Sequence, residues 1–479
     1  MAFGFGSYQI AKSGLYVNEQ ALNITGHNIT NMNTPGYVRQ QVIIKDAPYQ
    51  SSLYDRGNLQ QIGLGADLQQ IRQIRNDFLD DIYRNENTDL GYWEARQKSV
   101  QEVEAILADP MGKGLQWAMN QFWDSWQELA KEPESLTVKA IVRQRGEALV
   151  NTINHISSQF DKLRSDLGEE INTRINEVNK ITSQIAELNI DIFKYEAAGG
   201  TANDYRDQRN LLADRLTKLI NADITENQEG LMFITIEGHA IVNRSKSVNL
   251  YVDMDKEPGK KLSYTPKIEG SEISVPIKGG LIGGLIDSVK EVDDVKNLLN
   301  ELIGTMTEEV NRLHKSGKTM GNPPKDGEDF FTSLKIGSDG GNIGLGNIKL
   351  NDNLKDPNNI VASKSGYSGD NTIALDIANL RHAALIADNT GILNMDEYYR
   401  TIILKVGQSG NKAAEISENQ RKLVQAADMN RQTLSGVSLD EEMTFMMKYK
   451  FAYDASSRAF NAIDDMIDTL INRMGIVGR

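Results

Sequence analysis

The C-terminal stretch LDEEMTFMMKYKFAYDASSRAFNAIDDMIDTLINRM (residues 439–474) decides the fold. When it is followed in alternating steps of three and four residues, nine of eleven positions are apolar. This is the pattern of a coiled-coil helix that continues for about five heptads. Ser438, followed three residues later by Glu441, predicts a capping box at the start of the helix. The positions of this seam are Leu439, Glu442, Met446, Tyr449, Tyr453, Ser456, Phe460, Ile463, Ile467, Leu470 and Met474.

This terminal helix needs a partner. A lone helix leaves its apolar seam in water and gains almost none of the free energy of burial. The partner is either the N-terminal helix of the same chain or a neighbouring copy in an assembly. We hypothesise that both chain ends are loosely ordered in the monomer and become helical when they dock. The alternative is an intramolecular helical hairpin that forms part of the core.

The N-terminus shows a second helix. Ala11, Leu15, Leu22 and Ile29 mark one of its faces. The sequence NTPGY (residues 33–37) ends it, because a residue before proline is excluded from helical geometry and Pro-Gly suits the centre of a type II turn. We expect this helix to be short.

The prolines divide the chain. Six of ten lie between residues 258 and 357, and none lies in 134–257 or 358–479. Helices can therefore be long in the flanks but not in the middle. Short β-rich runs at 231–236 and 272–277 also lie in the middle. The pattern predicts a mainly α protein with long antiparallel helices, a terminal coiled coil and an inserted α+β or β module.

Composition excludes several classes of protein. The chain has 479 residues, a net charge of −14 and no cysteine. No apolar run is long enough to span a membrane, so we expect a soluble protein. The N-terminus has no basic, apolar or cleavage region of a secretory signal. An acidic chain without a basic block is an improbable partner for nucleic acid.

No pattern in the sequence indicates catalysis, a metal or a cofactor. The five histidines are scattered without an H-E-x-x-H pair, and the glycines at 279–284 lack a phosphate-loop pattern. Trp117, Trp123 and Trp126 have near-helical spacing, which favours core packing over a ligand-stacking box. We therefore expect a protein that is not an enzyme and needs no cofactor. A secreted enzyme with coiled-coil oligomerisation ends is the alternative from another class.

Several motifs resemble those of one family. LNITGHNITNMNTPGY (22–37) is similar to the N-terminal signature of flagellar rod, hook and hook-associated proteins. SGVSLDEE (435–442), with Tyr449, Ala452, Tyr453 and Ala455 after it, resembles the hook-associated protein 1 family in particular. So do DQRNLL (207–212), GGL (283–285) and NRLHKSG (311–317). The agreement keeps the same order along nearly the whole chain. A distal rod or hook subunit of the same axial family is the alternative.

The resemblance implies a structural subunit that assembles into the junction between flagellar hook and filament and so supports motility. Its implied partners are further copies of itself, the hook protein, the second hook-associated protein and an export chaperone that binds the C-terminal helix. It implies secretion, unfolded, through the flagellar type III channel, without a cleaved signal. A chain without cysteine suits that route.

We expect three units on this basis. Residues 1–45 and 438–479 form a terminal coiled-coil layer; 46–221, 283–316 and 367–437 form a long-helix domain; and 222–282 with 317–366 form one small β-rich outer module. The expected assembly interface is Leu15, Leu22, Ile29, Thr34, Pro35, Gly36, Tyr37, Leu439, Met446, Tyr449, Tyr453, Phe460, Ile463, Ile467, Leu470 and Met474.

Overall fold

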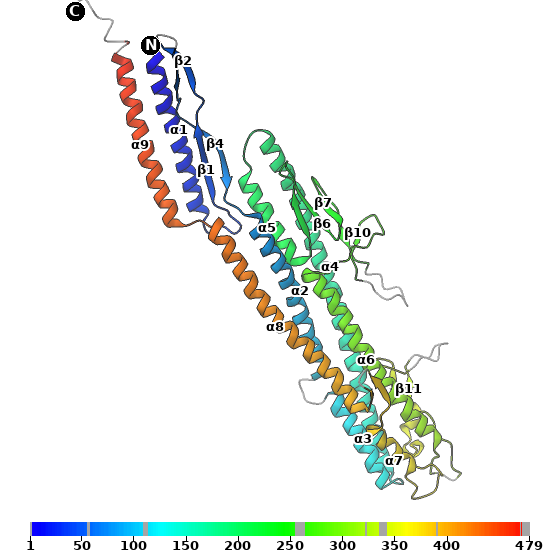
Figure 1. The fold of residues 1–479 in the computed structure, drawn as a ribbon. Helices are drawn as coiled ribbons and strands as arrows, with labels where there is room; N and C mark the ends of the chain where they lie inside the picture. The colour runs from blue at the N-terminus through cyan, green and yellow to red at the C-terminus, as the bar shows by residue number, and fades with distance from the viewer. Residues whose placement is uncertain are drawn as a thin grey trace, which may run out of the picture.

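The computed structural model describes residues 2–54, 58–108, 114–253, 264–320, 323–334, 343–388, 391–469 and 471. The molecule is elongated, and the helices α1 and α9 that carry the two chain ends lie side by side at one end of it (Figure 1). Within these ranges, no helix combines the length and hydropathy that crossing a membrane requires.

Long helices run along the body. Helix α4 alone has 62 residues, which corresponds to about 90 Å at 1.5 Å per residue. It begins at Ser135, whose side chain accepts a hydrogen bond from the Val138 amide. The body helices are α2 (Asp77–Ala108), α3 (Leu115–Lys131), α4 (Leu136–Ala197), α5 (Asn203–Leu219), α6 (Gly280–Ser316), the short α7 (Thr372–Asn379) and α8 (Met395–Ser435), with three 3-10 turns at Asp352–Lys355, Pro357–Asn359 and Leu380–His382. The prediction of a mainly α protein with long helices is confirmed.

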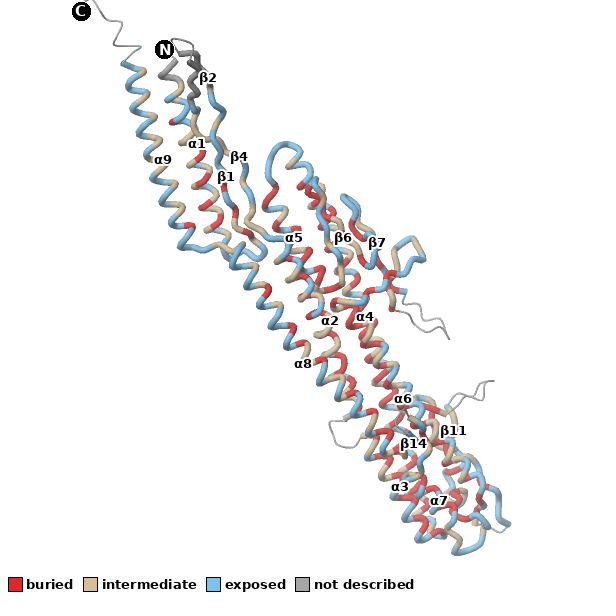
Figure 2. Tube along the Cα trace, viewed as in Figure 1, coloured by how far each residue is buried: buried red, intermediate tan, exposed pale blue. Residues whose placement is uncertain are grey.

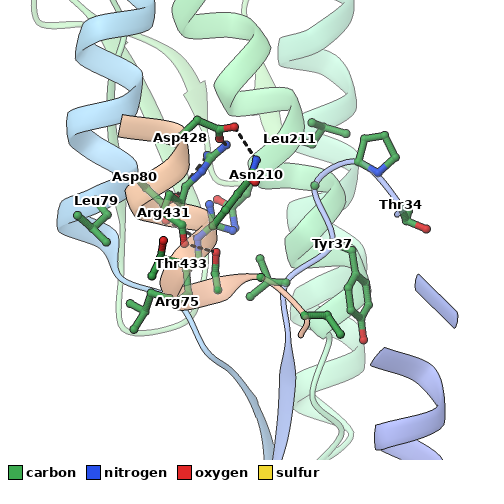
Figure 3. Close-up of a pocket in the computed structure, with 18 of the residues that line it drawn as sticks. Thr34, Tyr37, Arg75, Leu79, Asp80, Asn210, Leu211, Asp428, Arg431 and Thr433 are labelled. Atoms are coloured by element: carbon green, nitrogen blue, oxygen red, sulfur yellow. Dashed lines mark hydrogen bonds and ion pairs between the residues drawn. The ribbon is translucent and has the colours of Figure 1, made fainter. Parts of the chain in front are cut away.

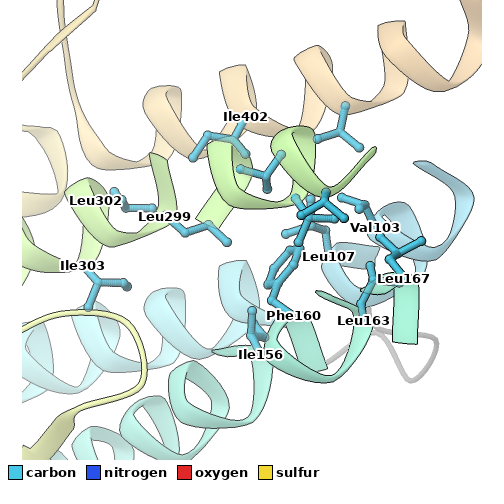
Figure 4. Packing of buried hydrophobic residues seen from close by; sticks show 14 of the residues in the cluster. Val103, Leu107, Ile156, Phe160, Leu163, Leu167, Leu299, Leu302, Ile303 and Ile402 are labelled. Carbon is cyan, nitrogen blue, oxygen red and sulfur yellow. The ribbon is translucent and has the colours of Figure 1, made fainter. Parts of the chain in front are cut away.

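The hydrophobic core runs through the body along α2, α4, α6 and α8 (Figure 2). Figure 4 shows how Leu107 of α2, Phe160 of α4, Leu299 of α6 and Ile402 of α8 converge from four helices. All four side chains are buried. Because apolar residues recur every three or four positions along each helix, each helix presents one continuous stripe to its neighbours.

An aromatic cluster closes the core at the far end of the body. Trp123 and Trp126 of α3 are fully buried beside Phe122, Phe330 and Phe331, with the Trp126 and Phe330 ring centroids 5.5 Å apart. The core interpretation of these two tryptophans is confirmed. It was wrong for Trp117, which is 38% exposed.

Four strands lie in the described parts of residues 40–73, although most of this segment was expected to begin the long-helix domain. Strand β1 (Gln40–Asp46) pairs antiparallel with β4 (Ala66–Gln73), and β2 (Gln50–Tyr54) pairs with β3 (Asn58–Ile62). The register of the first pair joins Gln40 to Gln73. β-branched residues at 42–44 and the alternation of polar and apolar residues at 66–72 favour extended backbone.

The β-rich insertion is two separate patches rather than one module. A four-stranded antiparallel sheet, in the order β5-β6-β7-β8, packs beside α4, whereas β11 and β12 lie beyond the other end of α6 (Figure 1). Helix α6, which has 37 residues and is therefore about 55 Å long, lies between the two patches in the chain. The strands are β5 (Asp223–Glu226), β6 (Met232–Ile236), β7 (His239–Asn243), β8 (Lys246–Ser247), β9 (Leu250–Tyr251), β10 (Lys267–Ile268), β11 (Phe331–Ser333), β12 (Ile348–Leu350), β13 (Ile386–Asp388) and β14 (Gly391–Leu393).

Side-chain amides of the long helices fix both patches. Asn189 of α4 bonds the Met232 amide and carbonyl of β6, and Asn311 of α6 bonds the backbone of Phe330 and Phe331. The predicted strand at 231–236 is confirmed as β6. The predicted strand at 272–277 was wrong, since this segment makes only a single bridge, from Ser274 to Lys267.

Candidate assembly site at the paired chain ends

The two chain ends form one antiparallel helical pair. Helix α1 (Ala2–Asn31) has 30 residues, so the expectation of a short helix was wrong; no proline occurs before Pro35 to stop it. It lies against α9 (Leu439–Asp468). The Tyr8 and Phe460 ring centroids are 4.7 Å apart, and a Cβ atom on Gly14 would lie 2.8 Å from the Ser456 Oγ. The pair is therefore in close contact along its length.

The pair is covered on one side only. In Figure 2, α9 is almost entirely exposed or intermediate, unlike α4. Leu439 is exposed, while six predicted seam positions are half-buried: Met446, Tyr449, Tyr453, Phe460, Ile463 and Ile467. Leu470 and Met474 lie outside the described residues.

The buried face of α1 differs from the predicted one. Leu15, Leu22 and Ile29 are half-buried. The buried residues of the helix are Ala11, Val17, Ala21, Thr25 and Asn28. Of the predicted face, Ala11 is buried, whereas the two leucines and the isoleucine are only half-buried.

The turn after α1 has the predicted type II geometry. The Tyr37 amide donates to the Thr34 carbonyl over 3.1 Å, and Gly36 has a φ of +82°. A side chain there would be strained and would meet Leu211 of α5, whose Cβ would lie 3.0 Å away. Thr34, Pro35 and Gly36 are exposed and Tyr37 is half-buried. The turn therefore rests on the body through Leu211.

Asn28 connects both chain ends. Its Oδ1 accepts hydrogen bonds from the Tyr37 hydroxyl at 2.7 Å and from the Gln40 amide at 3.0 Å. Its Nδ2 donates to the Gln40 carbonyl at 2.9 Å and to the Glu442 carboxylate at 3.0 Å. The amide group pairs with the Gln40 backbone as a neighbouring strand would, and it is buried. All four of its hydrogen-bonding positions are satisfied.

Arg39 makes the second connection. Its Nε donates to the Glu442 Oε1 at 2.7 Å, and its Nη1 donates to the Glu441 Oε2 at 2.8 Å. The guanidinium also lies 5.6 Å from the Phe445 ring centroid. The predicted capping box was therefore wrong. Ser438 is the N-cap residue without a side-chain bond. The Glu441 carboxylate forms a charge-assisted bond to Arg39 in place of a bond to the helix end.

Helix α5 holds the other side of this joint. The Asp207 carboxylate accepts hydrogen bonds from the Val38 amide at 3.2 Å and from the Gln73 side chain at 2.7 Å. Burial raises the pKa of Asp207 to about 7 against the opposing effect of these bonds. Gln40 also donates to Asp204 at 2.9 Å. The terminal pair is thus attached to the body mainly through polar contacts.

A hollow of about 550 Å³ lies at the joint, between the turn, the start of α2, α5 and the end of α8 (Figure 3). Arg431 crosses it, with 2.5 Å to Asp214 and 2.8 Å to Asp428, and stacks 4.0 Å from the Tyr83 ring centroid. Arg75 pairs with Asp80. Within the described residues, no group of three or more histidine, aspartate or glutamate side chains is arranged to hold a metal. The charged side chains around the hollow pair with one another. This arrangement is typical of a structural contact between two parts of a protein.

The buried histidine of the body is also structural. The Nδ1 of His314 donates to the Glu328 carbonyl, and its Nε2 accepts from the Val361 amide at 3.1 Å. Burial lowers its pKa to about 4, so it is neutral at pH 7. Its contacts fix the loop of residues 323–334 against α6.

The sequence did not predict the cluster of Asn28, Arg39 and Glu442, which we call the polar hub. One feature of the sequence nevertheless indicated a buried polar contact at this place. Glu442 is 2% exposed and is the only charged residue among the eleven positions of the predicted seam. A lone charge at such a position indicates a buried polar partner. Nothing in the sequence indicated that the partners are Asn28 and Arg39. Among the described interface candidates, Tyr37 forms a hydrogen bond to Asn28 of the hub.

An elongated helical body that carries both chain ends as one antiparallel pair is the class of protein that this fold and site define. The described ends match two rod-protein families. Residues 9–37 match the flagella basal body rod protein family, and residues 430–474 match the C-terminal family of the flagellar basal body rod FlgEFG proteins. Residues 100–331 match the helical domain of flagellar hook-associated protein FlgK.

Full-length relatives agree with the helical-domain match. The chain is 29% identical to flagellar hook-associated protein 1 of Bacillus subtilis over 100% of both chains. It is 23% identical to the protein of that name in Salmonella typhimurium, over 96% of this chain and 98% of the other. Over its whole length, the chain is thus similar to proteins described as flagellar hook-associated protein 1. The rod families match only its ends, so the rod or hook alternative is not favoured.

A solved structure shares the fold. The flagellar hook junction protein FlgK from Burkholderia pseudomallei superposes with a TM-score of 0.63 at 13% identity, covering 74% of this chain and 100% of that one. At this identity the likeness concerns the fold alone.

Proposed function

We propose that the chain is a structural subunit without catalytic activity, which assembles with copies of itself into the junction between the flagellar hook and filament. One observation carries the proposal: the two chain ends form a helical pair that is covered on one side only. A finished intramolecular hairpin would bury its seam, whereas the described apolar positions of the α9 seam are half-buried or exposed. Outside the seam, Met443, Met447 and Phe451 are exposed as well. Exposed apolar faces of this kind mark association surfaces.

The predicted interface residues fall into two groups with different roles in the proposed assembly. The half-buried seam of α9 and Leu15, Leu22 and Ile29 of α1 lie where a second helix could complete their burial. Residues 34–37 instead set the angle between the pair and the body, since the turn bonds to Asn28 and packs on Leu211. Each copy would then present its terminal pair to its neighbours in the same orientation.

The proposed partners are the hook protein, the second hook-associated protein and an export chaperone on the C-terminal helix. The half-covered seam supports the chaperone site, because a chaperone can bury it before assembly. Export of the unfolded chain suits a protein without cysteine.

Deletion of residues 438–479 tests this proposal in a flagellated host that lacks its own copy. We expect no incorporation of the subunit, no chaperone binding, and release of filament subunits into the medium. The matched control is Tyr367→Ala, which alters an exposed loop at the opposite end of the molecule and should leave assembly intact. Normal motility of the deletion strain would refute the junction role.

A further inference from the structure

Two apolar surfaces lie on either side of α1, β1 and β4 (Figure 1). One is the outer face of the first turns of α9; the other is the corner formed by α4 and α5 (Figure 1). Copies placed side by side in the same orientation would bring the first surface of one copy next to the second surface of the other.

The α9 surface, which we name the outer stripe, is apolar with a basic border. Met443, Met447 and Phe451 are spaced by four residues and are 51%, 53% and 69% exposed. They face away from the seam that packs on α1. Lys448 and Lys450 flank the Met447–Phe451 pair, one on each side. Within the described residues, neither lysine forms an ion pair.

The α4–α5 surface is a groove of about 370 Å³. Leu188 of α4 and Leu211 and Leu212 of α5 provide its apolar lining, and all three are half-buried. Glu187 and Asp191 stand one turn apart on the α4 rim and are exposed. Asp191 has only a long contact of 3.9 Å, to Lys194 of its own helix. The groove is therefore apolar with an acidic border.

The geometry points to a second copy of this chain as the occupant: the outer stripe of one subunit docks into the α4–α5 groove of the next. Met447 and Phe451 would fill the apolar groove, and a flanking lysine would face Glu187 and Asp191. This complementarity of shape and charge selects partner and register. Because the two surfaces differ and lie on one chain, the contact is head-to-tail and can continue around a ring.

This inference rests on the proposed self-assembly but adds to it a defined contact between two surfaces. The proposed contact between subunits also involves the joint between the terminal pair and the body. Leu211 lines the groove and also packs against Gly36 of the turn. Docking at the groove therefore acts on the same element that fixes the orientation of the terminal pair.

Cysteine cross-linking in assembled flagella tests the contact, since the chain has no cysteine of its own. The variant carries Met447→Cys on the stripe and Gln184→Cys on the exposed rim of the groove. We expect a short bis-maleimide to give a ladder of subunit multiples. The matched control, Met447→Cys with Tyr367→Cys, should give none. A ladder from the control that equals that of the variant would overturn the inference.

Charge reversal tests the complementarity in the same cysteine variant. Lys448→Glu with Lys450→Glu should lower ladder yield about tenfold, and so should Glu187→Lys with Asp191→Lys. Combining all four changes should restore it. All these positions are exposed, so the thermal unfolding of each purified variant should match that of the parent. Absence of rescue in the combined variant would overturn the pairing.

The outcomes separate the two proposals. If flagella assemble normally but no ladder forms, the docking inference fails and the junction role stands. If a single product of another mass forms instead, the groove binds a different protein and the inference fails. If the unmodified subunit is absent from flagella, the proposed function itself fails.

Discussion

The body and the terminal pair are both built from long antiparallel helices, yet they bury different kinds of side chain. In α4, leucines, isoleucines and phenylalanine are buried along the whole helix. Of the residues described in α9, only Glu442 is buried. The same periodicity thus produces a finished core in one region and a half-covered seam in the other. A seam of half-buried aromatic residues around one buried charge indicates an interface whose burial is completed by another molecule.

The first way to test this difference is to remove one large side chain from each region. Phe160→Ala empties the core of the body, where Phe160 is fully buried. We expect a loss of about 3–5 kcal/mol in the free energy of unfolding. Phe451→Ala in the outer stripe should change it by no more than about 0.5 kcal/mol.

Urea unfolding followed by far-UV circular dichroism measures the free energy of unfolding of both variants. Similar losses for the two variants would mean that the outer stripe is already packed in the monomer, which contradicts the comparison.

The second test concerns the buried charge. Glu442→Gln keeps the shape of the side chain but removes the charge that faces Arg39. We expect the docking of α9 on α1 to weaken by about 1.5–3 kcal/mol, because a charged hydrogen bond in a buried site is lost. Hydrogen exchange of the α9 amides measures this local opening.

Glu441→Gln is the matched control. Its carboxylate also bonds Arg39 but is 59% exposed, so its loss should cost less than about 1 kcal/mol. A larger effect from Glu441 than from Glu442 would show that the buried hub does not hold the ends together.

The smallest expected effect concerns the joint between the two regions. The pKa of Asp207 is about 7 in the folded chain, against about 3.9 when unfolded. Between a pH of about 4 and a pH of about 7, the Asp207 carboxyl is therefore protonated in the folded chain and ionised in the unfolded chain. The contribution of Asp207 to the free energy of unfolding is complete below pH of about 4 and is lost as the pH rises through about 7.

Asp207→Asn should flatten this pH dependence by on the order of 1–2 kcal/mol between pH 4 and 7. Asp204→Asn, an exposed neighbour on the same helix, removes only a nearby charge that contributes to the raised pKa of Asp207, so it should flatten the slope by a smaller amount. The measurement is the free energy of unfolding of each variant at several pH values across this pH range. An unchanged slope for the Asp207 variant would show that this carboxyl titrates normally.

The sequence predicted the helices of both regions because periodicity and proline placement act locally. The helix end and turn at Thr34 to Tyr37 followed from Pro35 and Gly36 alone. The strands at 40–73 were missed, because a few β-branched residues do not distinguish a strand from a short buried helix segment. The two β patches were merged into one, since the sequence does not reveal that they lie at opposite ends of α6.

The polar hub could not be predicted for a related reason. Asn28 and Glu442 lie 414 residues apart in the chain, and no local pattern joins them. Periodicity shows which face of a helix is covered but not which residue covers it. The capping interpretation of Ser438 and Glu441 failed because the Glu441 carboxylate bonds to Arg39, which the tertiary fold brings in, in place of a bond to the helix end.

The central claim is that the terminal pair becomes fully ordered only in an assembly, and hydrogen exchange in dilute monomer tests it most directly. We predict that amides of α9 exchange within seconds to minutes while those of α4 remain protected for hours, and that α9 gains protection on assembly. Protection of α9 equal to that of α4 in the dilute monomer would contradict the account.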